Sequence, residues 1–379
     1  MNKKSLSILI YSLDSGGAER VVSILLSELG KHYNITLFLM NKTLFYDVPK
    51  NVNIVFLEQS NPSEKGIVKL FKLPLLAWKY KKINRSDISL SFMNRPNYIN
   101  VLAKLFGMKS RTIISERAMP SLQHKSGLQG FINRFLIKHL YRLSDLVIAN
   151  SLGNSYDLKE SFNIKNVITI SNPIDIDKIN SLSKVNIKLK NDKFTIITIG
   201  RLDSGKNHKL LINAIRDIDV YLYIIGEGVL KLELEKLIKD IGVENKVFLL
   251  GRIANPYAYL SKSDCFIFTS NYEGFPNVLL EALACALPVI STDCLSGPRE
   301  ILSSSNHIDK QLTNGIELVE YGILSSVNDV NALAKAINLM KEDDILRKQY
   351  SEKSAIRIKE FDTSIIIDRF ISAIESKNV

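Results

Sequence analysis

Short apolar runs alternate with amphipathic segments along almost the whole chain. Runs rich in Ile, Leu and Val are typical of strands buried on both faces of a parallel sheet. Segments in which apolar residues return every three or four positions indicate helices with one face on a core. In the first half, the pattern predicts strands at 6–11, 35–40, 52–57, 88–93, 112–115, 146–150 and 167–170, and helices at 18–29, 67–83, 98–106, 128–140 and 152–161.

The same alternation begins again near Phe194, after two runs, 172–175 and 184–192, that are typical of a hinge. Strands separated by helices form right-handed βαβ units, so each series predicts a parallel sheet. The second series places strands at 194–199, 220–225, 247–250, 265–269 and 288–291, helices at 208–218, 230–241, 256–261 and 276–286, and a last long helix from near residue 330.

The predicted fold class is therefore α/β, with two doubly wound, Rossmann-like domains that face a cleft. We expect an N-terminal domain at 1–172 and a C-terminal domain at 173–359. The segment 360–379 contains an amphipathic helix, which is expected to pack back on the first domain. Such sheets bind ligands beyond the carboxyl ends of their strands, and two facing sets of ends suit an enzyme that joins two substrates.

The net charge of +11 belongs mainly to the first half of the chain. Residues 1–190 hold 28 Lys and Arg against 13 Asp and Glu, whereas residues 191–379 hold 22 against 26. This asymmetry disfavours a nucleic-acid binder with a uniformly basic surface. The chain also lacks the strand motifs of RNA readers and a recognition-helix signature.

Other classes of protein are disfavoured by residue counts and spacing. The three cysteines lack paired spacing and the five histidines lack metal-ligand spacing, so neither a disulfide framework nor a zinc site is expected. No segment has the ~18 uninterrupted apolar residues that cross a bilayer. Residues 1–13 superficially resemble a signal peptide, but Ser7 and Ser12 interrupt their apolar core, which favours a first strand. We therefore expect a cytoplasmic protein and not an exported solute-binding protein.

The most informative segment begins at Glu273 and reads EGFPNVLLEALA. It follows a predicted strand and opens a predicted helix, with Pro276 where a first-turn proline belongs. The amides near Phe275 and Asn277 would then point outward, where phosphate binds through free donors and the helix dipole. Glu273 and Glu281 flank such a site and suit the recognition of hydroxyl groups. The alternative is structural, with Glu273 as a cap and Glu281 as a solvated helix residue.

A second loop is expected at the same edge of this sheet. The strand at 194–199 ends in Gly200 and Arg201, with Lys206 shortly after them. Arg grips phosphate through two parallel hydrogen bonds and Lys acts as a point charge. The alternative is a surface turn with two solvated cations, and the tight turn at 226–228 adds only weak support.

Taken together, these segments resemble glycosyltransferase family 4, whose members are retaining enzymes with the GT-B fold. Glu273 and Glu281 match the E-x7-E pattern of such enzymes, and Gly200, Arg201 and Lys206 resemble their diphosphate clamp. Further similar segments, spread over nearly the whole chain, are GGAER at 16–20, NPID at 172–175 and LPVIST at 287–292. The runs SER at 115–117 and SGPRE at 296–300 are similar to the bacterial surface-polysaccharide subgroup.

The resemblance implies a role for each motif residue. Glu281 would accept hydrogen bonds from ribose hydroxyls, and Glu273 would engage hydroxyls of the transferred sugar. Arg201 and Lys206 would neutralise the departing diphosphate. Two cations and a helix dipole can replace a divalent metal, so no metal is expected, and the D-x-D sequences that start at residues 175 and 217 are rejected as metal sites. The other donor-binding positions are Gly16, Gly17, Gly200, Phe275, Pro276 and Asn277.

One position departs from the family pattern. Many relatives have a histidine after the strand that faces the donor sugar, and this sequence has Glu116 and Arg117 there. We predict that Glu116 takes the place of the histidine and orients the acceptor or the sugar. It thereby joins the expected catalytic set of Arg201, Lys206 and Glu273. An ordinary loop acid paired with Arg117 is the alternative.

The basic first half contains a segment in which cations alternate with apolar side chains. Residues 63–86 hold seven basic residues and one acid, Glu64. A helix of this kind suits the interface of an anionic membrane, and Pro74 is expected to kink it. A second basic cluster follows at 125–142. The alternative is a core-facing helix with a solvated basic face. The residues assigned to the membrane and acceptor side are Lys69, Lys72, Trp78, Lys79, Lys81 and Lys82.

The resulting prediction is a retaining glycosyltransferase that moves a hexose or N-acetylhexosamine from a nucleotide diphosphate sugar, expected to be UDP-linked. The expected acceptor is a lipid-diphosphate-linked saccharide in capsule, O-antigen or related surface-glycan synthesis. The enzyme would lie at the inner face of the cell membrane, associated peripherally. The nucleotide sugar is a substrate, so no cofactor is expected. The alternative enzyme is a nucleotide-sugar epimerase or hydrolase of GT-B fold that uses no saccharide acceptor.

Overall fold

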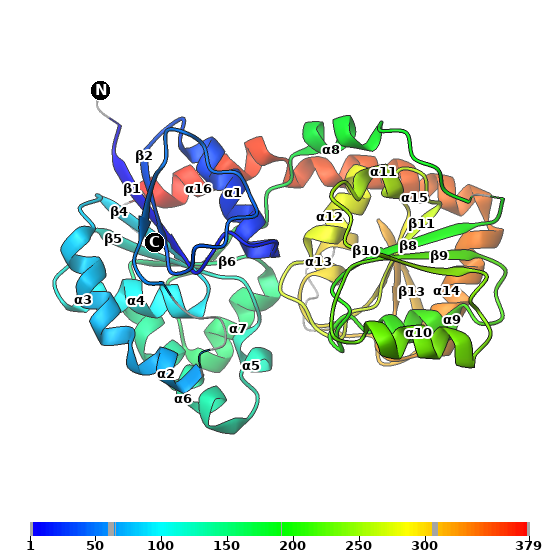
Figure 1. Cartoon of the computed structure of the whole chain (residues 1–379), viewed down its shortest axis with the longest axis horizontal. Coiled ribbons are helices and arrows are strands. Elements are labelled where there is room, and N and C mark those ends of the chain that lie inside the picture. Colours follow the sequence, from blue (N-terminus) through cyan, green and yellow to red (C-terminus); the bar gives the residue numbers. More distant parts are fainter. Residues whose placement is uncertain (1–2, 60–63, 65, 191, 305–309, 377–379) are drawn as a thin grey trace. The chain divides into compact units, whose positions relative to one another are not determined.

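The computed structural model describes residues 3–59, 64, 66–190, 192–304 and 310–376 (Figure 1). The chain divides into two compact units. Unit 1 comprises Met1–Pro173 with Thr363–Val379, and unit 2 comprises Ile174–Asp362.

Unit 1 is built on a parallel sheet of seven strands in the order β3-β2-β1-β4-β5-β6-β7. Chain order reverses between β1 and β4, which is the arrangement of a doubly wound sheet. The strands are β1 (Ser5–Ile10), β2 (Asn34–Leu39), β3 (Asn53–Phe56), β4 (Ile88–Phe92), β5 (Arg111–Glu116), β6 (Leu146–Ala149) and β7 (Val167–Thr169).

Helices cover both faces of this sheet, because its alternate residues are apolar on each side. One core joins the strands to the first and last helices of the chain, through residues such as Leu25 and Phe370. The other core includes Leu76, Ile99 and Ile137 from the opposite layer. The helices are α1 (Gly17–Leu29), α2 (Gly66–Phe71), α3 (Leu73–Ile83), α4 (Asn94–Leu105), α5 (Pro120–Gln123), α6 (Gly127–Leu140), the 3₁₀ turn η1 (Tyr141–Leu143), α7 (Leu152–Phe162) and α16 (Thr363–Glu375).

Unit 2 repeats the plan with the order β10-β9-β8-β11-β12-β14-β13, and only β13 runs antiparallel to its neighbour. The reversal of chain order falls between β8 and β11. The strands are β8 (Thr195–Ile199), β9 (Tyr221–Ile225), β10 (Val247–Gly251), β11 (Cys265–Phe268), β12 (Val289–Thr292), β13 (Ile316–Val319) and β14 (Gly322–Ser325).

The helices of unit 2 also form two layers. Residues of α9, α10 and α14 share one core, and residues of α8, α12 and α13 share the other. The helices are α8 (Ile176–Ser183), α9 (His208–Ala214), α10 (Lys231–Asp240), α11 (Tyr257–Leu260), α12 (Asn277–Ala284), α13 (Pro298–Leu302), α14 (Val330–Glu342), α15 (Asp344–Arg357) and the 3₁₀ turn η2 (Ile358–Phe361).

The predicted α/β class with two doubly wound units is confirmed, and four local predictions were incomplete or wrong. The helix predicted at 67–83 is two helices that meet at Lys72, close to the expected kink at Pro74. The last long helix ends at Glu342, and α15 begins after Asp343, whose side chain accepts a hydrogen bond from the Leu346 amide at 2.8 Å. Helix α8 lies between the two runs interpreted as a hinge, 172–175 and 184–192, and the pattern predicts neither this helix nor the β13–β14 hairpin.

The chain enters and leaves unit 2 at the same place. The Ile174 amide donates to the Phe361 carbonyl at 3.0 Å, and Ile174 forms a parallel bridge with Asp362. Unit 2 is therefore one continuous segment, whereas unit 1 is assembled from both ends of the chain. Its last helix is bound to the sheet by Arg111, which donates to the Ala373 carbonyl at 3.1 Å.

Candidate active site

The two loops of unit 2 that carry the strongest motifs meet where chain order reverses in the sheet. Open α/β sheets bind ligands at this point, beyond the carboxyl ends of the two diverging strands. Lys206 follows β8 and Glu273 follows β11, and their side chains form an ion pair. Both are mostly buried, at 21% and 15% exposure, and the Lys206 ammonium lies 5.3 Å from the centre of the Phe268 ring.

A set of hydrogen bonds fixes these two loops to each other. Thr269 donates from its hydroxyl to the Lys206 carbonyl at 2.9 Å. The Asn271 amide donates to the Gly205 carbonyl at 2.8 Å, and the Asn271 side chain accepts from Asn207 at 3.1 Å. The positions of Lys206 and Glu273 are therefore set by backbone and amide contacts, and not by their own ion pair alone.

The turn between β9 and α10 lies directly against the Gly200 loop. A Cβ atom added to Gly226 would lie 1.9 Å from the Gly200 carbonyl oxygen, and one added to Gly228 would lie 2.4 Å from that of Leu202. Only glycine permits so close an approach of two backbones. Arg201 projects from this loop with its side chain 82% exposed, 3.3 Å from a carboxylate oxygen of Asp203.

Beneath the same loop lies His208, which is 3% exposed. Its Nε2 atom is 3.2 Å from the Arg201 carbonyl oxygen, and its Nδ1 atom has no hydrogen-bond partner among the described residues. Burial lowers the pKa of His208 to about 4, so the ring is neutral at pH 7 and donates from Nε2 to Arg201.

Helix α12 begins at Asn277, so Pro276 caps the helix and does not stand in its first turn as predicted. Phe275 is buried, with its ring centre 5.7 Å from that of Phe361. Glu281, in the second turn of α12, is 3% exposed. Glu281 is therefore not a solvated surface residue.

The loop after β12 supports the Glu273 loop from the other side. The Ser296 hydroxyl donates to the Gly274 carbonyl at 2.7 Å, and a Cβ atom at Gly297 would lie 2.5 Å from Cδ of Pro276. Ser296 has a positive φ of 65°, which is uncommon for a residue with a side chain. The loop therefore holds a strained conformation against the start of α12.

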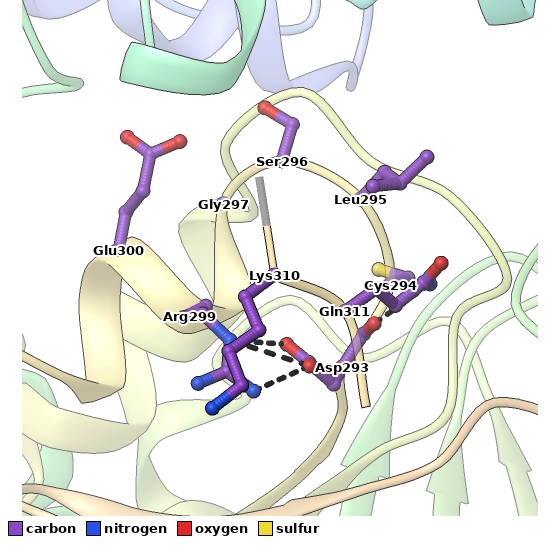
Figure 2. A pocket seen from close by; sticks show the side chains of 9 residues that line it. All are labelled: Asp293, Cys294, Leu295, Ser296, Gly297, Arg299, Glu300, Lys310 and Gln311. Carbon is purple, nitrogen blue, oxygen red and sulfur yellow. Dashed lines mark hydrogen bonds and ion pairs between the residues drawn. The ribbon is translucent and has the colours of Figure 1, made fainter. Parts of the chain in front are cut away.

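A small hollow of about 10 Å³ lies in this second loop (Figure 2). Its base is an ion pair between Arg299 and Asp293 at 2.6 Å, and Arg299 also lies 2.9 Å from Glu317 of β13. Figure 2 shows Ser296 and Glu300 pointing away from the Arg299–Asp293 pair. The hollow is too small for a sugar, so we interpret the ion pairs as supports that set the shape of the loop.

In unit 1, Glu116 ends β5 and is 1% exposed. The Tyr141 hydroxyl donates to one carboxylate oxygen at 2.7 Å, and the Arg117 and Ala118 amides donate to the other at 2.9 and 3.3 Å. Burial raises the pKa of Glu116 to about 7, against the lowering effect of these hydrogen bonds. Glu116 thus organises the loop that follows β5, and Arg117 in that loop donates to Asn172.

In the glycine loop after β1, a side chain from the first turn of α1 lies over Gly16. Gly16 caps α1, and a Cβ atom there would lie 2.1 Å from a carboxylate oxygen of Glu19. Burial raises the pKa of Glu19. The space over Gly16, one of the two glycines of this loop predicted to bind the donor, is thus occupied by a carboxylate.

The basic residues assigned to the membrane side differ in their contacts. Lys72 pairs with Glu64 and lies 3.6 Å from Glu58, and Lys79 donates to the Leu57 carbonyl. The Lys82 ammonium lies 3.4 Å from the centre of the Trp78 ring, which is 48% exposed. Lys69 lies 5.7 Å from the ring of Tyr11, and Lys81 is half-buried on α3.

The structure therefore brings the unit 2 candidates together and leaves the unit 1 candidates in separate places. Gly200, Arg201 and Lys206 lie on the loop after β8, whereas Glu273 and Glu281 belong to the loop after β11 and to α12. The unit 1 candidates lie at the start of α1, at the end of β5 and on the segment that forms α2 and α3. The supporting residues missed from the sequence are Thr269, Asn207 and Asn271.

Comparisons with known proteins show which family and which enzymes the chain is similar to. Residues 181–357 match the family model described as glycosyl transferases group 1. The chain is 45% identical, over 95% of its length and 96% of the relative's, to the N-acetylgalactosamine-N,N'-diacetylbacillosaminyl-diphospho-undecaprenol 4-alpha-N-acetylgalactosaminyltransferase of Campylobacter jejuni.

Two further matches cover almost the whole chain. A second C. jejuni enzyme, an alpha-1,4-N-acetyl-D-galactosaminyltransferase named for a GalNAc-GalNAc-diNAcBac-PP-undecaprenol substrate, is 29% identical over 98% of this chain and 99% of its own. Among solved structures, Anabaena Alr3699/HepE in complex with UDP and glucose matches with a TM-score of 0.76 and 19% identity, over 98% of this chain and all of that chain. The latter likeness concerns the fold.

Proposed function

Because the chain belongs to the group 1 glycosyltransferases, with the two-unit α/β architecture of the GT-B fold, we propose that it extends a lipid-linked saccharide. In this proposal, a hexose or N-acetylhexosamine passes with retention from a nucleotide diphosphate sugar, UDP-linked, to an acceptor carried on a lipid diphosphate. The product belongs to a surface glycan. The 45% identity with an enzyme named for an undecaprenol-diphosphate substrate supports the choice of acceptor.

The observation that carries the proposal is the Lys206–Glu273 pair at the reversal of the unit 2 sheet. A cation held at the ligand-binding edge of such a sheet is placed to meet a diphosphate as it leaves. Arg201, extended from the same loop, supplies a second cation with planar geometry suited to phosphate. We assign the diphosphate to these two side chains and to the start of α12.

The two motif carboxylates take different parts of the donor. Glu273, at the loop, is assigned to hydroxyls of the transferred sugar, and its pairing with Lys206 would align the sugar with the diphosphate. Glu281 is buried in the second turn of α12, close behind the start of the helix. We assign it to the ribose hydroxyls, because a carboxylate accepts hydrogen bonds from such groups.

We further propose that transfer needs no divalent metal. The charge that develops on the leaving diphosphate would be met by Arg201, Lys206 and the helix dipole of α12. Turnover should therefore continue after extensive treatment with EDTA. A loss of activity that Mg²⁺ or Mn²⁺ restores would contradict this part of the proposal.

The acceptor side is assigned to unit 1, which carries most of the positive charge. In the part of the chain that the structure describes, no helix has the length and apolar character needed to span a membrane. We propose that the protein lies on the cytoplasmic face of an anionic membrane through electrostatic and interfacial contacts, with Trp78 and the lysines of α2 and α3 on that side.

The test is an incubation of the purified protein with a panel of nucleotide sugars and of lipid-diphosphate-linked saccharides. Release of nucleotide diphosphate that depends on the acceptor, with a lengthened glycan, is the expected result. Release without an acceptor, or epimerisation of the donor, would favour the epimerase or hydrolase alternative. Equal turnover by Glu281→Ala would refute the assignment of the donor site.

A further inference from the structure

Two stripes of exposed apolar residues lie on neighbouring helices of unit 1. On α6, Leu128, Phe131 and Phe135 are 71%, 70% and 54% exposed, at the spacing of one helix face. The starts of α6 and α2 adjoin, because a Cβ atom at Gly66 would lie 2.4 Å from Nε2 of Gln129 (Figure 1). The second stripe, on α2 and α3, consists of Val68, Phe71, Leu75 and Trp78.

The segment of the chain that contains α6 carries charge of a single sign. Between Glu116 and Asp145 the sequence contains no acidic residue. The basic residues of this interval that are exposed are Lys125, Arg134, Lys138 and Arg142.

Large exposed apolar side chains and exposed cations on one segment favour one kind of binding partner. The buried centre of a protein–protein interface is depleted of charged residues, and of lysine in particular. A helix that lies in a lipid interface shows the opposite combination, with an apolar face among acyl chains and basic residues at the headgroups. Exposed apolar residues that adjoin one another mark a binding surface more often than isolated ones do.

We propose that α6 inserts Leu128, Phe131 and Phe135 into an anionic lipid bilayer and that the α2–α3 stripe contacts the same bilayer. The inference rests on the function proposed above and moves the main contact from the lysines of α2 and α3 to α6. Lys72 and Lys79 are engaged with Glu64 and Leu57 within the protein. Among the exposed cations around α6, Arg134 lies 5.4 Å from the centre of the Phe162 ring and Arg142 donates to His139 at 2.7 Å, so Lys125 and Lys138 are the cations we assign first to the headgroups.

Vesicle flotation of the full-length protein tests the surface. Vesicles of phosphatidylcholine with an equal amount of phosphatidylglycerol should bind it, and vesicles of phosphatidylcholine alone should bind it weakly. The triple variant Leu128→Ser, Phe131→Ser and Phe135→Ser should lose more than about tenfold in binding. The matched control replaces exposed apolar residues of unit 2, namely Val229→Ser, Leu232→Ser and Ile345→Ser, which are 90%, 79% and 73% exposed, and should bind as the wild type does.

The electrostatic part has its own variant and control. Replacing Lys125, Arg134 and Lys138 by Gln should weaken binding to the anionic vesicles by about fivefold for each residue, because a basic residue near an anionic leaflet contributes about 1 kcal/mol. The same replacement at three exposed lysines of unit 2, Lys236, Lys239 and Lys335, should have little effect.

The single tryptophan of the chain supplies an intrinsic probe of the second stripe. Trp78 is half exposed, so its fluorescence should shift to shorter wavelength on anionic vesicles and should be quenched by brominated lipids. The α6 triple variant should abolish both changes. Wild-type protein that fails to bind, an α6 variant that binds normally, or a wild-type dimer that the α6 variant converts to monomers would each overturn the proposal.

Activity assays separate this proposal from the function on which it rests. With a short-chain, water-soluble prenyl diphosphate saccharide, the α6 variant should turn over like the wild type, and with the same saccharide on a long-chain lipid in vesicles it should be impaired. Vesicle binding without any sugar transfer would refute the function and leave the docking surface intact. Transfer without vesicle binding would refute the docking surface alone.

Discussion

At the scale of single residues, the surroundings of Lys206 bear most directly on the proposed donor site. Its ammonium lies between the carboxylate of Glu273 and the face of the Phe268 ring, mostly shielded from water. Removing one partner of such a pair leaves a partly buried charge uncompensated. In the proposed mechanism, this ammonium meets the diphosphate at the edge of the sheet.

We predict that Lys206→Ala lowers kcat/KM about 10² to 10³-fold, the usual cost of one donor that stabilises a developing anion. Steady-state kinetics with a saturating acceptor measures this loss. The control is Lys209→Ala, which removes a partly exposed lysine of α9 that pairs with Glu233 of α10 and should leave kcat/KM unchanged. A fall of equal size in both variants would point to general destabilisation.

Glu116 predicts a dependence of stability on pH. Burial raises its pKa from the ordinary 4.5 to about 7, so between these values the folded protein keeps a proton that the unfolded chain has released. The stability that Glu116 contributes is therefore complete at low pH and declines as the pH rises to about 7. Urea unfolding of wild type and Glu116→Gln should show a difference in unfolding free energy that favours the wild type more at pH 5 than at pH 8.

The control for this experiment is Glu352→Gln, a substitution of an exposed helix residue. Its difference from the wild type should vary little with pH. A constant difference for Glu116→Gln as well would mean that the carboxyl is ionised in the folded protein throughout the range.

At the scale of elements, the backbone of the turn after β9 packs directly against the backbone of the Gly200 loop. We predict that Gly228→Ala destabilises unit 2 by about 1–3 kcal/mol and weakens donor binding, because a methyl group there meets the Leu202 carbonyl and not a flexible side chain. Thermal unfolding and titration with nucleotide diphosphate check the two effects. Glu227→Ala, in the same turn but exposed, should change the stability little.

Elements with strong apolar periodicity were predictable from the sequence, and those set by distant partners were not. The strands that begin at Ser5 and Cys265 are buried along most of their length, so their composition reveals them. β13 is only partly buried and is paired antiparallel with β14 through a turn. Its sequence therefore lacks the continuous apolar run that identifies the buried strands. The bond between Asn207 and Asn271 joins residues 64 positions apart, which no local spacing reports.

At the scale of the whole molecule, the two units have separate cores, so a substitution in one core should lower the stability of that unit alone. Phe370 of α16 is fully buried in the unit 1 core. We predict that Phe370→Ala lowers the stability of unit 1 by about 3–5 kcal/mol and leaves unit 2 unchanged. Hydrogen exchange read separately in the two units measures this. Ile365→Ala, at a 42% exposed position of the same helix, is the control.

The chain enters unit 2 at Ile174 and leaves it at Asp362, and this connectivity fixes the order in which the two units can fold during translation. Unit 2 is complete in the nascent chain once Asp362 has left the ribosome, but unit 1 still lacks α16. The apolar surface that Ile366 and Phe370 later cover stays open on a segment synthesised long before. Most of unit 1 is thus synthesised first but completes its fold last, and unit 1 without α16 is the state that chaperones would bind.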